Sequence, residues 1–585
     1  MPDVSSRKFA AVFARALADS GKLTKRELKD LEAAQAGIAN PKERAAARSI
    51  MLLLRKDAEL DSFELTPVRK ALGVLIGVSK GPLPKDLEAA LENAVPQANV
   101  QVKHYDLTFD FSPKKPPFPA RAVITLDAAA PADAILEVNP QRLSIASVTA
   151  GGKPVPFELR DGRLHVSARG AKAITVDYTV KPDDRKVTDT SFGLLRDKYT
   201  GHMWTLTWPY NTGALFPSSS DPADGSTARV TVKVGSGMEA VATGTQQADG
   251  SFVTSAEAPA YGIAVYTSPD FLPGDGGTSE DGVKVESFGR ARAATEPSRK
   301  AYRDTARAAL DFYASWLGKF DYGETLKLVE VDGPFFGMEH TAAVAMMMGA
   351  LRDVDDAKET AAHETAHHWF GDNVRIQHWG DFWMSEGFTN YATFRYFRHA
   401  EGEKKFFALL DEGKDALDDS LEENPHALIE PAHTEIAEIF DQVPYQLGPW
   451  MLRMMEVELG TSKFDALLRD WYQANRQKAV STAQFVAFAK KETGHDFGPF
   501  FARWNGITAV PRYDARVKLS GTQVEISLDA KAAGPKGLQI PVVLEGIHES
   551  KTVLVDPTKK LALDVGFQVT KVRWDPERTV LAYVE

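Results

Sequence analysis

The spacing of apolar and polar residues divides the chain into regions of different texture. Residues 1–98 are rich in good helix formers, most clearly in the run PKERAAARSIMLLLRK at 41–56. Asn40 and Pro41 suit an N-cap and a first helical position. The segment PKDLEAALE at 84–92 resembles a second helix opening with an acidic first turn. These patterns predict a helical N-terminal extension.

From residue 99 the pattern changes to the period-two alternation of strands. The segment VKHYDLTFDF at 102–111 alternates polar and apolar residues, and similar short runs follow, separated by turn residues. These runs are AVITLDA, AILEV, LHVSA, AITVDYTV and ARVTVKV. The pattern predicts an all-β domain over 99–275. Near its end we expect the glycine-rich segment GDGGTSEDG at 274–282 to be a linker or an exposed turn.

Residues 276–510 begin with strand-like segments and become mostly helical. TLKLVEV at 325–331 predicts a strand, and a loop with Gly and Pro follows it. After residue 510 alternation returns in RVKLSG, QVEISLDA, LQIPVVLEG, TVLVD and LALDVG, which predicts a β-sandwich over 511–585. A chain of 585 residues is too long for one core. We therefore expect a multidomain α+β protein.

Composition narrows the classes of function. The net charge of −11 argues against a nucleic-acid-binding protein. The chain has no cysteine, which excludes disulfides, thiol catalysis and cysteine-ligated zinc. Arg15 interrupts the short apolar stretch near the N-terminus, so a signal peptide is not expected, and no apolar run is long enough to span a membrane. We expect a cytoplasmic protein without a membrane partner, and its oligomeric state stays unknown.

The strongest chemical signal is HETAH at 363–367. On a helix, His363 and His367 lie four residues apart on one face and can bind one zinc ion, with Glu364 placed to activate the attacking water. A five-residue motif with two free positions also arises by chance. The simpler alternative to a zinc site is a pair of surface histidines beside a glutamate.

A catalytic zinc site needs a third protein ligand. Glu386 follows His367 by 19 residues, in DFWMSEGFTNY. That separation allows one helix to end and a second helix to present a carboxylate. Trp383, Met384 and Phe388 surround Glu386 in the sequence and argue against a fully solvated surface position.

HETAHHWFGD followed by WMSEGF closely resembles the gluzincin aminopeptidases of the aminopeptidase-N and leukotriene hydrolase type, with H-E-x-x-H-x-W-x-G and then W-L-x-E-G-F. The resemblance implies one catalytic Zn²⁺ ion held by His363, His367 and Glu386, with Glu364 as general base and proton shuttle. It also implies a β saddle domain at 99–275, a thermolysin-like catalytic domain at 276–510 and a C-terminal β-sandwich at 511–585.

Two further motifs extend the resemblance, each with a departure. Gly337, Met338 and Glu339 stand in the place of the family's G-x-M-E-N, which implies that they bind the substrate and that Glu339 holds its free α-amino group; Phe336 and His340 replace the usual Gly and Asn. VPYQLG at 443–448 stands for V-x-Y-x-K-G, which implies that Tyr445 donates to the oxyanion; Leu447 replaces the usual Lys.

For other conspicuous residues the sequence gives weaker evidence of a functional role. Phe216, Pro217 and Asp221 loosely match the family's F-P-x-x-D-x-P, and Trp208 or Tyr210 could line a side-chain pocket, although core packing is the simpler expectation. Trp369 is expected to pack behind the zinc helix and Met346–Met348 to fill the core. The remaining histidines, expected to be structural or at the surface, are His368, His378, His399 and His433.

The resemblance covers roughly residues 101–585 and implies a zinc aminopeptidase, a hydrolase acting on peptides with a free N-terminus. Many family members add a C-terminal helical domain over the active site, whereas this sequence continues no further than the sandwich. The N-terminal helices are expected to replace part of that wall or to mediate dimerisation. Three alternatives stay open: an endopeptidase for which Glu339 is incidental, a scaffold that binds peptides without cleaving them, and a dual activity such as epoxide hydrolysis. The preferred N-terminal residue and the physiological substrate are not indicated.

Overall fold

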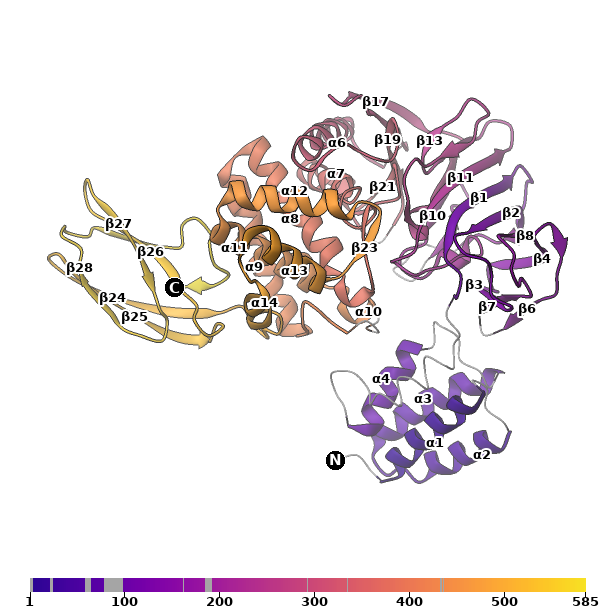
Figure 1. The fold of residues 1–585 in the computed structure, drawn as a ribbon, viewed down its shortest axis with the longest axis horizontal. Coiled ribbons are helices and arrows are strands. Elements are labelled where there is room, and N and C mark those ends of the chain that lie inside the picture. Colours follow the sequence, from indigo (N-terminus) through magenta and orange to yellow (C-terminus); the bar gives the residue numbers. More distant parts are fainter. Residues whose placement is uncertain are drawn as a thin grey trace. The chain divides into compact units, whose positions relative to one another are not determined.

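The computed structural model describes residues 4–20, 25–57, 65–77, 98–160, 162–184, 192–291, 293–333, 335–431, 434 and 436–585. The chain divides into two compact units. The first contains the residues up to 242 together with 246–253 and 260–269; the second contains 243–245, 254–259 and 270–585. Figure 1 labels their helices and strands.

The N-terminal residues form four helices: α1 (Val4–Ser20), α2 (Lys25–Ala36), α3 (Pro41–Asp57) and α4 (Leu65–Ile76). Helix α3 begins where the sequence predicts, because the side-chain oxygen of Asn40 accepts hydrogen bonds from the backbone N–H groups of Lys42 (2.9 Å) and Glu43 (3.3 Å). The helices share a core that includes Phe9, Phe13, Leu31, Ile50 and Leu72. The helix predicted over 84–92 lies outside the described residues.

The rest of the first unit is built from strands, as predicted. Among the strands of this unit, the largest sheet follows the order β14-β11-β1-β2-β8-β4-β5. A four-stranded sheet follows the order β12-β16-β10-β9, and a three-stranded sheet the order β3-β7-β6. The strands are β1 (Val102–Phe111), β2 (Phe118–Leu126), β3 (Ala134–Glu137), β4 (Leu143–Ala150), β5 (Lys153–Pro154), β6 (Phe157–Arg160), β7 (Arg163–Val166), β8 (Ala173–Val180), β9 (Gly193–Arg196), β10 (Met203–Leu206), β11 (Gly225–Val234), β12 (Glu239–Ala242), β13 (Thr245–Gln246), β14 (Phe252–Val253), β15 (Ala258–Pro259) and β16 (Val265–Ser268).

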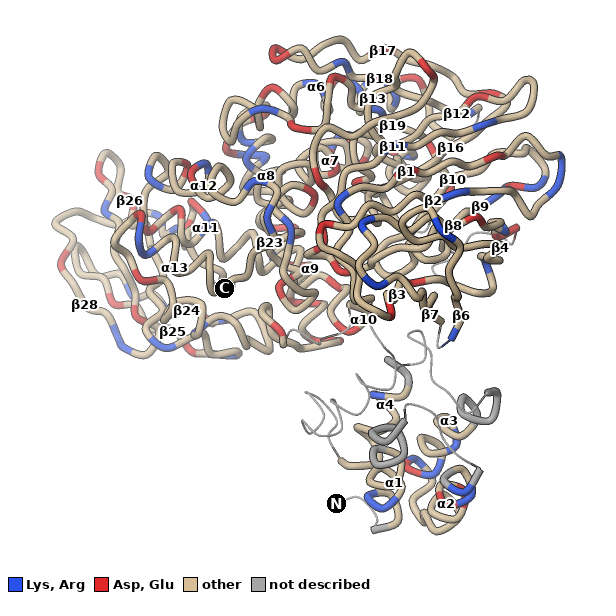
Figure 2. The backbone as a smooth tube through the Cα atoms, turned by 45° about the vertical axis from the view of Figure 1, so that its right-hand side comes forward, with Lys and Arg blue, Asp and Glu red and all other residues tan. Residues whose placement is uncertain are grey.

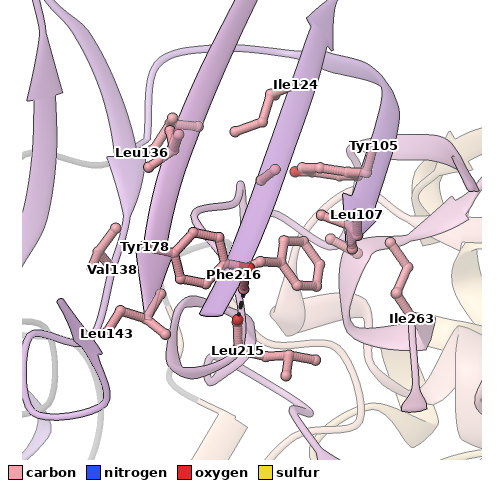
Figure 3. Close-up of a cluster of buried hydrophobic side chains, with 14 of the residues drawn as sticks. Tyr105, Leu107, Ile124, Leu136, Val138, Leu143, Tyr178, Leu215, Phe216 and Ile263 are labelled. Carbon is pink, nitrogen blue, oxygen red and sulfur yellow. Dashed lines mark hydrogen bonds between the residues drawn. The ribbon is translucent and has the colours of Figure 1, made fainter. Parts of the chain in front are cut away.

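Apolar side chains that alternate along these strands form one core (Figure 3). Phe216 lies in this core, where the ring of Tyr105 meets it edge-on at 5.1 Å between centroids. Tyr178 donates a hydrogen bond to the carbonyl of Leu215 at 3.2 Å. Trp208 is also buried. Both Phe216 and Trp208 are therefore explained by core packing, which is a simpler expectation than lining a side-chain pocket.

The second unit opens with a five-stranded sheet in the order β17-β18-β19-β21-β20. The strands are β17 (Leu272–Thr278), β18 (Lys284–Gly289), β19 (Thr325–Val331), β20 (Gly337–Met338) and β21 (Ala343–Met347). Strands β18, β19 and β21 run parallel, and the edge strands β17 and β20 run antiparallel to their neighbours. The strand predicted over 325–331 is confirmed as β19.

The glycine-rich segment at 274–282 corrects a prediction. The sequence predicts a linker or an exposed turn over 274–282. Residues 274–278 instead belong to β17 and pair with β18, whereas residues 280–282 form the expected exposed turn between the two strands. Glycine suits this strand because a Cβ at Gly276 would lie 2.8 Å from Val285 Cγ1, and one at Gly274 would lie 2.5 Å from an Arg303 guanidinium nitrogen. Close approach of neighbouring side chains, rather than flexibility, explains these glycines.

Helix α6 lies between β18 and β19 in the chain, the other helices follow the sheet, and α6, α7 and α8 pack on one another (Figure 1). The helices are α6 (Glu296–Leu317), α7 (Val354–Ala366), α8 (Trp383–Glu401), α9 (Glu403–Glu423), α10 (Ile436–Ile439), α11 (Gly448–Leu459), α12 (Thr461–Asn475), α13 (Thr482–Thr493) and α14 (Gly498–Trp504). A π-helical turn, Val443–Leu447, precedes α11. The short strands β22 (Val374–Ile376) and β23 (Lys478–Val480) pair in parallel.

The last residues form two facing sheets, which confirms the strands predicted after residue 510. One sheet has the order β28-β25-β24-β30 and the other β27-β26-β29. The strands are β24 (Arg512–Ser520), β25 (Gln523–Ala532), β26 (Ile540–Glu545), β27 (Ser550–Val555), β28 (Leu561–Asp564), β29 (Lys571–Trp574) and β30 (Tyr583–Val584). The three boundaries that the sequence places between the four domains stay predictions.

Charge is dispersed along the chain. Figure 2 shows Lys and Arg interspersed with Asp and Glu in both units. Among the described residues, no helix combines the length and apolar character needed to cross a membrane.

Candidate metal centre and active site

Helix α7 carries HETAH at its C-terminal end. Asp353 caps its start by accepting hydrogen bonds from the backbone N–H groups of Asp355 (2.7 Å) and Asp356 (3.3 Å). Ala361 and Ala362 are buried, and the hydroxyl of Tyr313 on α6 donates to the carbonyl of Ala362 at 3.1 Å. The small residues let α7 approach its neighbours closely, so the last turn of the helix is held firmly.

His363, His367 and Glu386 converge from α7 and α8. The Nε2 atoms of the two histidines lie 3.0 Å apart, and each lies 3.3 Å from Oε2 of Glu386. In a tetrahedral zinc site, ligands about 2.0–2.1 Å from the ion stand roughly 3.3 Å from one another. The observed triangle has these dimensions. Glu386 Oε2 is also buried, and none of the described residues donates a hydrogen bond to it, so the three side chains fit a bound metal ion.

The remaining nitrogens of the two histidines are held by hydrogen bonds. Nδ1 of His363 donates to Oδ1 of Asn390 at 2.7 Å, and Nδ1 of His367 donates to the carbonyl of Phe370 at 3.1 Å. The hydroxyl of Thr389 donates to the same carbonyl at 3.1 Å. With Nδ1 occupied, Nε2 of each ring is the nitrogen left for a metal ion, as in zinc sites generally.

The electrostatics of this cluster favour a cation. Burial opposes ionisation of Glu386, but His367 and His363 outweigh it and lower the pKa of Glu386 to about 2. Burial would lower the pKa of His367, yet Glu386 and Glu339 raise it well above its usual value. The carboxylates around His367 thus provide a field in which positive charge, on a proton or on a metal ion, is stable.

Glu364 points from α7 toward β20. A Cβ on Gly337 would lie 2.3 Å from Oε1 of Glu364, so the carboxylate lies directly over the glycine. Burial, with the charges of Glu339 and Glu386, raises the pKa of Glu364 well above its usual value. A carboxylate with a raised pKa is a better proton acceptor, as a general base requires.

Glu339 lies next to this group. One oxygen of Glu339, one of Glu364 and a ring nitrogen of His367 all lie within 4.8 Å of one another. Burial, together with the charge of Glu386, raises the pKa of Glu339 to about 7. His340 beside it is fully buried, and burial lowers its pKa to about 3, so this histidine is neutral. Phe336, in contrast, is 57% exposed.

Tyr445 lies on the π-helical turn, and its ring stacks over His363 with 6.4 Å between centroids. Its carbonyl accepts a hydrogen bond of 2.7 Å from Nδ2 of Asn390. Burial, followed by the charges of Glu386, Glu339 and Glu364, raises the pKa of Tyr445 well above 10, so its phenol keeps its proton. Leu447 is fully buried and fills a core position where the family has Lys.

Several site residues were not predicted from the sequence. Asn390 and Thr389 contact the ring Nδ1 atoms of His363 and His367, and Asn390 follows Glu386 by four residues on α8, a spacing that puts both on one helix face. Asp372 is fully buried, and neither carboxylate oxygen has a hydrogen-bond partner in the described part of the chain. Aromatic rings surround Tyr445: Phe382 at 5.8 Å and Phe440 at 6.2 Å.

The supporting residues lie as expected. Trp369 is buried against Tyr313 behind α7 and donates to the carbonyl of Gly318 at 2.9 Å. His368 is buried, and its Nε2 accepts from the N–H of Ala342 at 2.9 Å. His378 lies 3.3 Å from an oxygen of Asp381, His399 stacks on Phe312, and Met346 and Met347 fill the core. His433 lies outside the described residues.

Comparison with known proteins agrees with this geometry. Residues 304–504 match the Peptidase family M1 domain. A probable aminopeptidase 2 of Sulfurisphaera tokodaii is 22% identical over 510 residues, covering 82% of this chain and 63% of the relative. A probable aminopeptidase 1 of Saccharolobus solfataricus is 23% identical over 467 residues, covering 75% and 58%. The chain spans less than two thirds of the length of these relatives.

Solved structures show the same fold. The M1 zinc metallopeptidase of Deinococcus radiodurans, bound to a Tyr-Ser-Ala substrate, matches with a TM-score of 0.59 and 20% identity, over 70% of this chain and 95% of that one. Legionella pneumophila aminopeptidase A, in complex with aspartic acid, matches with a TM-score of 0.66 and 16% identity, over 84% and 60%. The chain thus contains a peptidase family M1 domain, which confirms the predicted resemblance and the multidomain α+β fold.

Proposed function

We propose that this chain is a zinc-dependent aminopeptidase that removes the N-terminal residue from peptides. One observation carries the proposal. His367 belongs both to the metal-sized triangle with His363 and Glu386 and to the buried group with Glu339 and Glu364. A metal ion, a general base and an anion for the substrate amine would then act at one place. When bound, zinc would act as a Lewis acid on the scissile carbonyl and lower the pKa of water.

Each protein group then has a defined task. Glu364 takes a proton from the attacking water and passes it to the leaving amine. The protonated phenol of Tyr445 donates a hydrogen bond to the developing oxyanion, an interaction worth about 3 kcal/mol in comparable sites. Glu339 pairs with the substrate ammonium and so places the first peptide bond at the reacting centre.

Gly337 and Met338 would bind the substrate backbone. They form β20, the edge strand of the sheet, and an extended peptide can add to such an edge through main-chain hydrogen bonds. Gly337 has a second role, because any side chain there would displace the carboxylate of Glu364.

The alternatives are less well supported. An endopeptidase would have no use for Glu339, a carboxylate buried beside Glu364 that needs a cationic partner. A binding scaffold without activity would have no use for a general base and a phenol donor placed around the same metal-sized triangle. Epoxide hydrolysis has no specific support among the described residues.

The test compares free and N-acetylated aminoacyl amides as substrates, with the zinc content of the protein measured in parallel. We expect cleavage of the free-amine substrates alone, loss of activity with a chelator, and recovery when zinc is added back. Equal cleavage of the acetylated substrates would favour the endopeptidase. No cleavage by zinc-loaded protein would favour the scaffold. The cytoplasmic location, the free-amine peptide partners and the absence of a nucleic-acid partner remain parts of this proposal, and cell fractionation tests the first.

A further inference from the structure

The π-helical turn that carries Tyr445 is capped by a residue that precedes the turn and its N-cap position. Gln442, directly before the turn, makes no side-chain cap. Oδ1 of Asp441 instead accepts a hydrogen bond of 2.9 Å from the N–H of Val443, the first residue of the turn. Oδ2 of Asp441 accepts from Nδ2 of Asn424 at 2.9 Å. The orientation of the Asp441 carboxylate therefore determines where the turn begins.

His426 holds that carboxylate. Its Nε2 lies 3.0 Å from both oxygens of Asp441, and its Nδ1 lies 2.8 Å from the carbonyl of Ala427. Both ring nitrogens thus face oxygen acceptors. A neutral imidazole has one N–H, so both hydrogen bonds form together only when His426 is an imidazolium.

The surroundings stabilise this ion pair. The charged groups facing His426 are Asp441 and, at 4.0 Å, Glu430. Burial disfavours the imidazolium, but Asp441 outweighs it and raises the pKa of His426. Burial likewise opposes ionisation of Asp441, and His426 in turn lowers its pKa. The side chains are 11% and 22% exposed, so solvent screens the pair weakly.

The segment that carries His426 is tied to the same framework as the metal centre. Oε1 of Glu430 accepts from the N–H of Ala427 at 2.8 Å. The N–H of Glu430 donates to the carbonyl of Gly380 at 2.9 Å, just before the helix that presents Glu386. The turn of Tyr445 is therefore attached to this framework at its start through His426 and Asp441, and at Tyr445 itself through Asn390.

We propose that His426, through its ion pair with Asp441, is a positioning residue that holds Tyr445 at the place where its phenol meets the oxyanion. The inference rests on the proposed function, since Tyr445 acts there as the oxyanion donor. His426 touches neither the metal ligands nor Glu339 by any contact of the described residues. Its loss should therefore reduce kcat and leave KM for a free-amine substrate nearly unchanged.

The test is a double-mutant cycle of His426→Gln and Tyr445→Phe, with kcat and KM measured on a free-amine aminoacyl amide. Displacement of a catalytic group by a fraction of an ångström to 1 Å lowers rates by roughly 10- to 100-fold, which is the range we expect for kcat of His426→Gln. In the Tyr445→Phe background the same change should alter kcat by less than about twofold, because the group being positioned is already gone.

Two variants serve as companions. Asp441→Asn keeps the shape of the cap but removes its charge, and should repeat the kcat loss if His426→Gln folds poorly. His165→Gln breaks another His–Asp contact, in which Nδ1 of His165 on β7 lies 2.9 Å from an oxygen of the more exposed Asp133, and should leave kcat unchanged. An equal loss of kcat in both Tyr445 backgrounds, or a rise in KM without a fall in kcat, would overturn the inference. Inactive wild-type protein would overturn the proposed function itself.

Discussion

The amide oxygen of Asn390 accepts a hydrogen bond of 2.7 Å from Nδ1 of His363. The amide nitrogen of the same side chain donates to the carbonyl of Tyr445, also at 2.7 Å. One side chain therefore contacts both the ring of His363 and the turn that carries Tyr445. Movement of α7, of α8 and of that turn should be coupled through Asn390.

Two substitutions at Asn390 should separate these tasks. Asn390→Asp keeps an acceptor for His363 but loses the donor to Tyr445, so zinc affinity should hold within about threefold while kcat falls. Asn390→Ala removes both contacts, so zinc affinity should also fall by roughly 10- to 100-fold. Competition with a chelator measures affinity, and kcat is measured at saturating zinc. Equal loss of zinc affinity in both variants would contradict this division of tasks. Asn475→Asp on α12 is the control, because the amide of Asn475 also donates to a backbone carbonyl, that of Trp471.

Glu364→Gln should abolish turnover while leaving zinc in place. The amide is nearly isosteric with the carboxylate but cannot accept a proton, and general-base catalysis contributes typically about 10²- to 10⁴-fold. The metal triangle of His363, His367 and Glu386 does not include this side chain. Metal analysis and kcat on free-amine substrates give the result directly. Zinc loss in parallel with activity would place Glu364 among the ligands instead.

Glu339→Gln should remove discrimination by the substrate amine. The carboxylate is buried, and one of its oxygens lies within 4.8 Å of an oxygen of Glu364. A buried charge pair lost on one side costs several kcal/mol, so kcat/KM for free-amine substrates should fall by about 100-fold or more. Activity on N-acetylated amides should change little from its low starting level. The control is Glu403→Gln, which removes a solvent-exposed ion pair with Arg398. An equal fall in kcat/KM on free-amine and N-acetylated substrates would show that Glu339 acts on the reaction rather than on the substrate amine.

Local patterns in the sequence predicted the elements that depend on local physics. The period-two runs became β1, β8 and β19 with little change in their bounds. The Asn40–Pro41 start of α3 followed from capping chemistry. The i,i+4 spacing of His363 and His367 was enough to place both on one face of α7. The residues that the sequence brought forward as metal ligands lie together in the structure.

Contacts made between distant segments were not predictable in the same way. His426 and Asp441 are 15 residues apart along a segment whose sequence has no repeating apolar pattern, so no periodicity indicates that they meet. The glycine-rich start of β17 looked like a linker because glycine composition hides the backbone pairing with β18. Asn390 could have been predicted as a site residue, since it shares a helix face with Glu386. Its hydrogen bond to Tyr445, however, depends on tertiary structure.

A buried carboxylate away from the metal centre should make stability depend on pH. Glu456 on α11 accepts hydrogen bonds from Arg453 (2.6 Å), Arg398 (2.8 Å) and Tyr391 (2.9 Å). Burial alone would raise its pKa, but Arg453 and Arg395 outweigh it and lower the pKa of Glu456 to about 2. A carboxylate whose pKa is lower in the folded than in the unfolded chain contributes stability above the unfolded value, about 4.3, and loses it as pH falls through the folded value.

Glu456→Gln should therefore destabilise the protein by on the order of 3 kcal/mol near pH 7, because the buried guanidinium groups lose their counter-charge. The difference between wild type and variant should stay constant down to about pH 5 and narrow toward pH 3. Urea unfolding midpoints, followed by tryptophan fluorescence at each pH, measure it. Glu525→Gln, which removes an exposed pair with Lys560 on the C-terminal sheet, should show little difference at any pH. If the difference in unfolding free energy between wild type and Glu456→Gln did not narrow in acid, the shape of the Glu456 side chain, rather than its charge, would account for its contribution to stability.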